Sequence, residues 1–183
     1  MPRSGGGEIG RRLACRLGRR GEPPADRWGP LLVGSACGLC GVRGREELSR
    51  RLPAPLPWSD LSCACLLAGS EALGAAQAEY RRSDGVPGAG LLVPEADGAG
   101  PAVLLDEAED VGRRNAVDKI LGACLRRGEY PLERPAELLV TGRISFEIVQ
   151  KAALAGLSAV AGIGAPTDLA VATAERSGTG LYG

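Results

Sequence analysis

Two cysteines, Cys37 and Cys40, are the residues whose type and spacing could best do chemistry. They form a C-x-x-C pair in the sequence C-G-L-C-G at residues 37–41, and a glycine follows each cysteine. Glycine bends without a Cβ clash, so the two thiols can meet on one tight turn. Arg43 and Arg45 follow, and positive charge near a thiol favours the thiolate. A thiolate is a nucleophile and a metal ligand, so the pair could serve redox chemistry, metal binding or sulfur carriage.

Composition excludes several other classes of protein. The chain has 183 residues, with 22 Lys and Arg against 22 Asp and Glu, so its net charge is zero. That balance argues against a nucleic-acid surface built from bulk charge, and an aromatic content of 3% argues against base-stacking platforms. The chain contains no histidine, which excludes histidine-dependent triads and histidine metal ligands. No nucleic-acid partner is therefore expected.

The cysteine count and the hydropathy pattern indicate a reducing compartment. Six cysteines in a chain of this length are too sparse for a disulfide scaffold. The first residues are rich in glycine and arginine, and no apolar core of a signal peptide follows them. No apolar run is long enough to span a bilayer. We therefore expect a cytoplasmic protein without a membrane segment.

Metal binding is the main alternative to thiol chemistry. Cys63 and Cys65 could supply two further thiolates to Cys37 and Cys40, which would make a zinc-bound structural or interaction module without catalysis. The C-x-C spacing makes a poorer half-site, however, and both residues lie in an apolar, helix-like run. We predict that Cys63 and Cys65 are buried and apolar in role, as is Cys124, and that no metal is bound.

The order of elements predicts an α/β layer. Residues 1–30 read as a disordered or atypical leader, and residues 31–183 as one domain. Strands are expected at 102–105 (buried), 138–140 and 158–163. Helices are expected at 60–80, at 115–127, from Ser145 to Gly156 and from Thr167 to Gly178, with a turn-rich loop at 83–90. Short strand-to-helix joints indicate parallel strands, whose joints should cluster at one sheet edge.

Two of these joints carry groups that suit an anion. Arg113, Arg114 and Asn115 open a helix directly after a strand, where backbone amides and guanidinium groups could hold a phosphate or pyrophosphate. The joint that follows the next strand carries Thr141, Arg143 and Ser145. These six residues are the candidate ligand-binding residues.

Four segments together resemble one family. They are C-G-L-C-G at 37–41, E-D-V-G-R-R-N-A-V-D-K at 109–119, T-G-R-I-S-F-E-I-V-Q-K-A at 141–152 and A-P-T-D-L-A-V at 165–171. Their order and spacing are similar to those of the formate dehydrogenase accessory sulfurtransferases, FdhD. The similarity covers residues 34–183.

The resemblance implies a function and a fold. It implies a sulfurtransferase that takes persulfide sulfur from a cysteine desulfurase and passes it to the molybdenum bis-guanine-dinucleotide cofactor needed by formate dehydrogenase. Cys37 matches the persulfide residue, and Cys40 would be a second carrier or a resolving thiol. The implied fold is a three-layer α/β sandwich resembling that of the cytidine deaminases. The expected partners are the desulfurase and formate dehydrogenase, with a homodimer as an option.

The sequence also departs from the family pattern. Arg114 stands where the family usually has histidine, and Pro87 stands at a second histidine position. The family extends further at both ends, including an aromatic and basic C-terminal stretch that helps to bind the cofactor. These departures indicate a truncated or divergent member, and an inactive fragment of the same family is a further alternative.

Overall fold

The computed structural model describes residues 52–53, 62–93 and 102–183. All of them belong to one compact unit, Leu32–Gly183. The leader predicted at residues 1–30, and the cysteine pair Cys37 and Cys40, lie outside the described residues.

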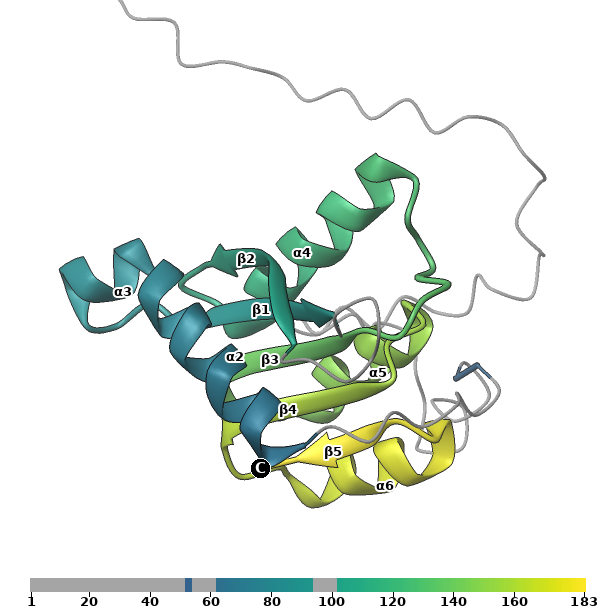
Figure 1. Cartoon of the computed structure of the whole chain (residues 1–183). Coiled ribbons are helices and arrows are strands. Elements are labelled where there is room, and N and C mark those ends of the chain that lie inside the picture. The colour runs from purple at the N-terminus through teal and green to yellow at the C-terminus, as the bar shows by residue number, and fades with distance from the viewer. Residues whose placement is uncertain (1–51, 54–61, 94–101) are drawn as a thin grey trace, which may run out of the picture. The chain divides into compact units, whose positions relative to one another are not determined.

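The described chain forms a mixed sheet with helices on both faces (Figure 1). The sheet order is β2-β1-β3-β4-β5. β1 is antiparallel to both of its neighbours, and β3, β4 and β5 are parallel. In chain order the elements are α2 (Cys63–Ala76), α3 (Ala78–Ser83), β1 (Gly88–Val93), β2 (Val103–Glu109), α4 (Arg113–Arg127), β3 (Glu137–Arg143), α5 (Phe146–Leu154), β4 (Ala159–Gly164), α6 (Asp168–Ser177) and β5 (Gly180–Tyr182).

Alternating side chains of the strands divide the core between two faces of the sheet. Leu138 and Val140 of β3 join the larger cluster, which packs against α4, α5 and α6. Leu139, between them, points to the other face and packs with Leu73 of α2. Figure 1 shows α2 across one face and α5 and α6 behind the other. The predicted three-layer α/β sandwich is confirmed.

Most helix boundaries follow from residues at the predicted ends. α4 ends at Gly128, which adopts φ 78°, and its N–H donates to the carbonyls of Cys124 and Leu125. α6 begins after Thr167, whose hydroxyl accepts from Ala170 N at 3.3 Å, and it ends at Gly178 with φ 66°. Glycine takes this left-handed conformation without the penalty that a Cβ imposes.

Three predictions for the first half of the fold are wrong. Residues 83–90 were predicted as a loop, but Gly88–Val93 is β1, which lies between β2 and β3. The strand predicted as buried at 102–105 is the first part of β2, which is the outermost strand of the sheet, and Val103 there is 46% exposed. The helix predicted at 60–80 breaks at Gln77, which has ψ 90°.

The glycines of β1 explain the first of these errors. A Cβ on Gly90 would lie 2.7 Å from Leu104 Cδ1, and one on Gly88 would lie 2.5 Å from Gln77 Nε2. The glycines therefore allow α2 and β2 to approach the strand closely and do not mark a turn.

Candidate functional site

The joints that follow β2, β3 and β4 lie at one edge of the sheet. β2 and β3 are both antiparallel to β1, and β4 is parallel to β3, so all three strands end on the same side. Three helices, α4, α5 and α6, begin at this edge. The predicted clustering of the joints is confirmed, and we call this edge the carboxyl edge.

Asp110 organises the joint between β2 and α4. Its Oδ1 accepts from Gly112 N and from Asn115 Nδ2, both at 3.0 Å, and its Oδ2 pairs with Lys119 Nζ at 2.7 Å. The bond from Lys119, with those from Gly112 and Asn115, lowers the pKa of Asp110 to about 2. The amide of Asn115, a predicted ligand-binding residue, is thus used inside the protein to hold this joint.

We expect Asp110→Ala to lower the melting temperature at pH 7, because the joint loses three bonds to one carboxylate. The folded pKa lies below the unfolded value of about 3.9, so the stabilisation is complete above that value and disappears as the pH falls to about 2. Melting curves of both proteins at pH 7, 4, 3 and 2 should therefore converge at low pH. A difference in melting temperature between the two proteins that stays constant down to pH 2 would contradict the stabilising role assigned to the Asp110 carboxylate.

Arg114 is bound to α5. Its Nη1 lies 2.8 Å from Oε1 of Glu147, whose side chain is 8% exposed. A second ion pair, between Lys151 Nζ and Asp118 Oδ2 at 2.7 Å, joins the same two helices. Arg114, predicted to bind ligand, therefore helps to fix the packing of α4 against α5.

Thr141 is also engaged within the sheet. Its Oγ1 accepts from Gly88 N at 2.9 Å and lies 3.3 Å from Gly88 O, to which it can donate. The hydroxyl thus ties the end of β3 to the start of β1. Its role in the described structure is to hold the carboxyl edge together.

In the remaining three predicted residues, a polar group is either buried without a hydrogen-bond partner or exposed to solvent. Arg113 Nε and Ser145 Oγ are buried and have no hydrogen-bond partner. Arg143 is exposed, and its Cγ lies 3.1 Å from where a Cβ on Gly164 would stand. Arg113 Cδ lies 3.5 Å from the corresponding position on Gly142, the residue before Arg143.

The helix starts beside these residues lack side-chain caps. Gly112 precedes α4, and Ser145 precedes α5 without bonding to its amides. Uncapped N–H groups and the positive end of a helix dipole attract anions. With Arg113 and Arg143 at the same edge, this arrangement is suited to phosphate or pyrophosphate.

The remaining cysteines differ from one another. Cys63 is exposed and Cys65 is half-buried, so the prediction that both are buried is wrong. The Ser62 hydroxyl donates to Cys65 Sγ at 3.1 Å, and this bond and the Ala102 N–H lower the pKa of Cys65. Ser62 precedes α2 as its N-cap and stands three residues before Cys65. This spacing is the sequence signal that could have revealed the hydrogen bond to Cys65. Cys124 is fully buried, as predicted, and burial raises its pKa.

The described residues, 52–53, 62–93 and 102–183, offer neither a metal site nor a membrane-spanning helix. Within these ranges, no three Cys, Asp or Glu side chains could hold a metal ion. The zinc alternative requires Cys37 and Cys40, which lie outside these ranges. No helix in the described part of the chain is both long and apolar enough to cross a bilayer.

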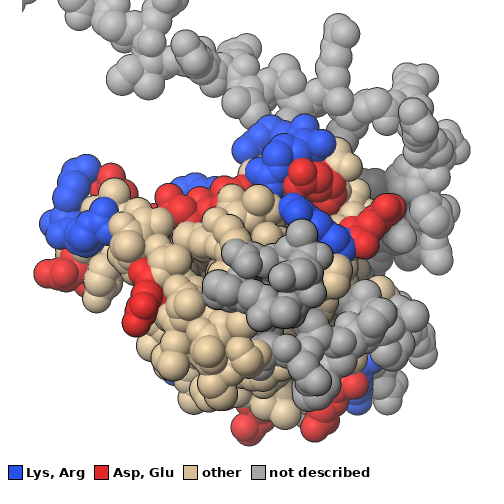
Figure 2. Space-filling model, viewed as in Figure 1, with Lys and Arg blue, Asp and Glu red and all other residues tan. Residues whose placement is uncertain are grey.

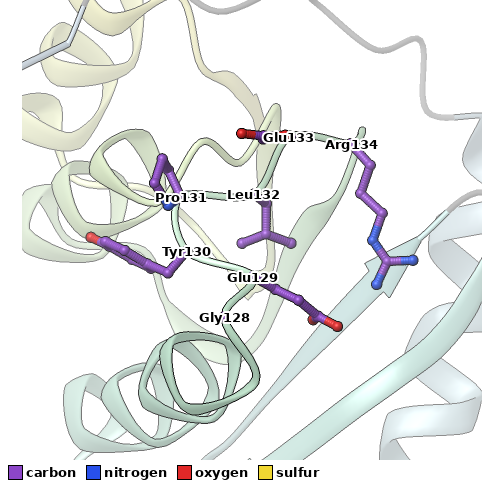
Figure 3. A pocket seen from close by; sticks show the side chains of 7 residues that line it. All are labelled: Gly128, Glu129, Tyr130, Pro131, Leu132, Glu133 and Arg134. Atoms are coloured by element: carbon purple, nitrogen blue, oxygen red, sulfur yellow. The ribbon is translucent and has the colours of Figure 1, made fainter.

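A hollow of about 540 Å³ lies at the opposite edge of the sheet (Figure 3). One loop lines it, from Gly128 to Arg134. Figure 3 shows the side chains of Glu129 and Arg134 on the same side of this loop. No predicted site residue lines this hollow, so Arg134 is a suitable control for substitutions at the carboxyl edge.

Comparison with known proteins identifies the family. The profile of the FdhD/NarQ family matches residues 15–183. The chain belongs to the FdhD/NarQ family. It is 44% identical over 157 residues to a sulfur carrier protein FdhD of Anaeromyxobacter dehalogenans (strain 2CP-C), covering 82% of this chain and 52% of that one. It is 40% identical over 172 residues to an FdhD of Mycolicibacterium paratuberculosis (strain ATCC BAA-968 / K-10), covering 92% and 59%.

A solved structure agrees with the family assignment. A crystal structure of a formate dehydrogenase accessory protein from Desulfotalea psychrophila aligns with TM-score 0.60 and 27% identity, covering 74% of this chain and 54% of that one. The chain thus spans about half the length of the FdhD relatives that it matches.

Proposed function

We propose that this chain is a sulfur carrier in the maturation of formate dehydrogenase. Membership of the FdhD/NarQ family carries the proposal, because the relatives are named sulfur carrier proteins. The C-x-x-C pair Cys37 and Cys40 supplies the chemistry. A reducing cytoplasm would keep both residues as thiols.

The transfer proceeds by thiol exchange. The Cys37 thiolate attacks the outer sulfur of a persulfide on a cysteine desulfurase. A new S–S bond forms on Cys37, the S–S bond of the donor breaks, and the donor cysteine leaves as a thiolate. As a second carrier, Cys40 would attack the outer sulfur, and Cys37 would leave as the thiolate. As a resolving thiol, Cys40 would attack Cys37 Sγ, so that the Cys37–Cys40 disulfide forms and the outer sulfur leaves as hydrosulfide, which passes to the molybdenum bis-guanine-dinucleotide cofactor as substrate.

The carboxyl edge supports the proposed binding of the cofactor that receives the sulfur. The substrate carries pyrophosphates, and arginine holds such groups in bidentate fashion. Arg113, Arg143 and Ser145 are its binding residues, while Arg114, Asn115 and Thr141 hold the edge in shape. Each charge-assisted hydrogen bond is worth about 1.5–3 kcal/mol.

The direct test is sulfur loading. The purified chain is incubated with a cysteine desulfurase and cysteine, and its intact mass is measured before and after treatment with a thiol. The proposal requires an adduct of one sulfur that the thiol removes. A chain that stays unmodified while a full-length FdhD is loaded in parallel would refute the carrier role.

Nucleotide binding tests the edge separately. We expect Arg143→Ala to weaken binding of GDP, used as a surrogate for the guanine-nucleotide ends, by about tenfold, since 1.4 kcal/mol is tenfold in affinity. Calorimetric titration at low salt measures the affinity for GDP. High salt should weaken the binding of GDP by the wild-type protein. Arg134→Ala is the matched control and should leave the affinity unchanged. Equal affinities of the Arg143 and Arg134 variants would remove Arg143 from the site.

A further inference from the structure

The outer edge of β2 is the longer of the two sheet edges that no described strand covers. β2 (Val103–Glu109) pairs with β1 alone. It has seven residues, whereas β5, at the other side of the sheet, has three. Figure 1 shows β2 at the margin of the sheet, beside β1. An unpaired edge presents backbone N–H and C=O groups that can bond to an added strand.

Two apolar side chains of this strand are exposed. Val103 is 46% exposed and Leu105 is 41% exposed. Leu105 stands at a β-bulge, opposite the junction of Leu91 and Leu92, and has no partner residue on β1. Because a bulge interrupts the ladder, a strand added to this edge would pair with residues 106–109 and contact the two apolar side chains at one end.

The same strand is acidic. Its sequence, V-L-L-D-E-A-E, contains three carboxylates and no lysine or arginine. Asp106 is paired with an arginine of α4 at 2.9 Å, and Glu109 accepts two backbone N–H groups at the start of α3, each at 2.7 Å. Glu107 is exposed, and no described residue forms an ion pair or hydrogen bond with its carboxylate. Glu107 is therefore available to a cation from outside.

The charge on this edge selects the kind of strand that fits it. Burial raises the pKa of Glu107, and the carboxylates of Glu109 and Asp106 raise it further. Figure 2 shows acidic side chains gathered over β2. Like charges directly opposite one another destabilise a strand pair, so β2 of a second copy fits this edge poorly. A basic strand would instead place its cations against these carboxylates.

We propose that the outer edge of β2 docks an extended, basic segment of a partner protein. The backbone of that segment continues the sheet beyond β2, one of its basic side chains pairs with Glu107, and its apolar side chains contact Leu105 and Val103. This docking surface goes beyond the sulfur carrier role and does not depend on it.

Fluorescence anisotropy with a labelled peptide tests the proposal on the full chain. The probe is the peptide Arg-Val-Arg-Val-Arg-Val-Arg, blocked at both ends and titrated at low salt. We expect Glu107→Lys to weaken binding about tenfold, because an attractive cross-strand pair becomes a repulsive one. Glu175→Lys makes the same change of charge at an exposed position of α6 and is the matched control. It should bind the peptide as the wild-type protein does, and equal affinities of the two variants would overturn the proposal.

A second peptide separates strand addition from simple attraction of charges. Proline in place of the central valine keeps the charge of the peptide but removes a backbone N–H and does not fit the middle of a sheet. We expect this peptide to bind about tenfold more weakly. Equal binding of the two peptides would overturn strand addition, and so would a wild-type protein that binds neither of them.

Hydrogen–deuterium exchange locates the bound peptide on the wild-type protein, without any substitution. Saturating Arg-Val peptide should slow the exchange of backbone amides in residues 103–109, because an added strand bonds to this edge. Exchange in β5 should stay unchanged. Unchanged exchange in β2, at peptide concentrations where anisotropy shows saturation, would place the peptide elsewhere and overturn the proposal.

Discussion

Replacing Cys37 with alanine is expected to abolish sulfur loading, down to the level seen without a desulfurase. The reason is that Cys37 supplies the nucleophile that forms the new S–S bond, whereas Cys40 acts only after that bond has formed. Intact-mass analysis of the variant after incubation with desulfurase and cysteine measures the effect directly. This is the largest change expected for any single substitution in the chain.

Two further variants complete that experiment. Cys63→Ala removes an exposed thiol outside the C-x-x-C pair and should keep the full adduct. Cys40→Ala should also keep the adduct if Cys40 only carries the sulfur onward or resolves it. If Cys40→Ala loses the adduct while Cys37→Ala keeps it, the two roles are reversed. An adduct that survives in both variants would place sulfur loading outside the pair.

Replacing Arg114 with alanine is expected to destabilise the fold by about 2–3 kcal/mol. It leaves the Glu147 carboxylate, whose side chain is 8% exposed, without its cation 2.8 Å away. Removing one partner of a buried ion pair typically costs about 3–5 kcal/mol, and we expect less because Arg114 is 36% exposed. Urea denaturation followed by circular dichroism gives the free energy of unfolding.

Controls distinguish the ion pair from a general effect of losing an arginine. Arg134→Ala removes an exposed arginine of the loop after α4 and should change stability by less than about 0.5 kcal/mol. Adding Glu147→Gln to Arg114→Ala should recover part of the loss, because it removes the buried charge. If Arg114→Ala behaves like Arg134→Ala, the pair contributes nothing to the fold, and Arg114 returns to the list of ligand-binding candidates.

Local patterns predicted the second half of the fold well. The apolar run at 138–140 lies within β3, the run at 158–163 overlaps β4 at 159–163, and Gly128 and Gly178 end α4 and α6. Buried strands and glycine C-caps depend on a few adjacent residues, so they can be recognised without knowing the partners. The resemblance to FdhD likewise rested on short motifs, and the family profile confirms it over residues 15–183.

Features that depend on distant partners were not predicted. Gly88 and Gly90 are of a residue type common in loops, but they lie in the strand β1. A Cβ at these two positions would collide with the side chains of Gln77 and Leu104. The exposure of Cys63 was likewise not predicted, whereas the lowered pKa of Cys65 has a local cause first, the hydroxyl of Ser62 three residues away. A single sequence contains the residues of these contacts and does not state their pairing.

The candidate site shows most clearly which features follow from the local sequence and which depend on distant partners. The sequence by itself determined which joints carry arginine, asparagine and hydroxyl groups, because those joints follow strands that a local pattern predicts. Only the tertiary structure decided that Asp110 binds Asn115, that Glu147 binds Arg114, that Arg113 Nε has no hydrogen-bond partner among the described residues, and that Arg143 is exposed. The physical reason is that a charged side chain binds whichever opposite charge folding brings within reach, and Glu147 lies 33 positions from Arg114 along the chain.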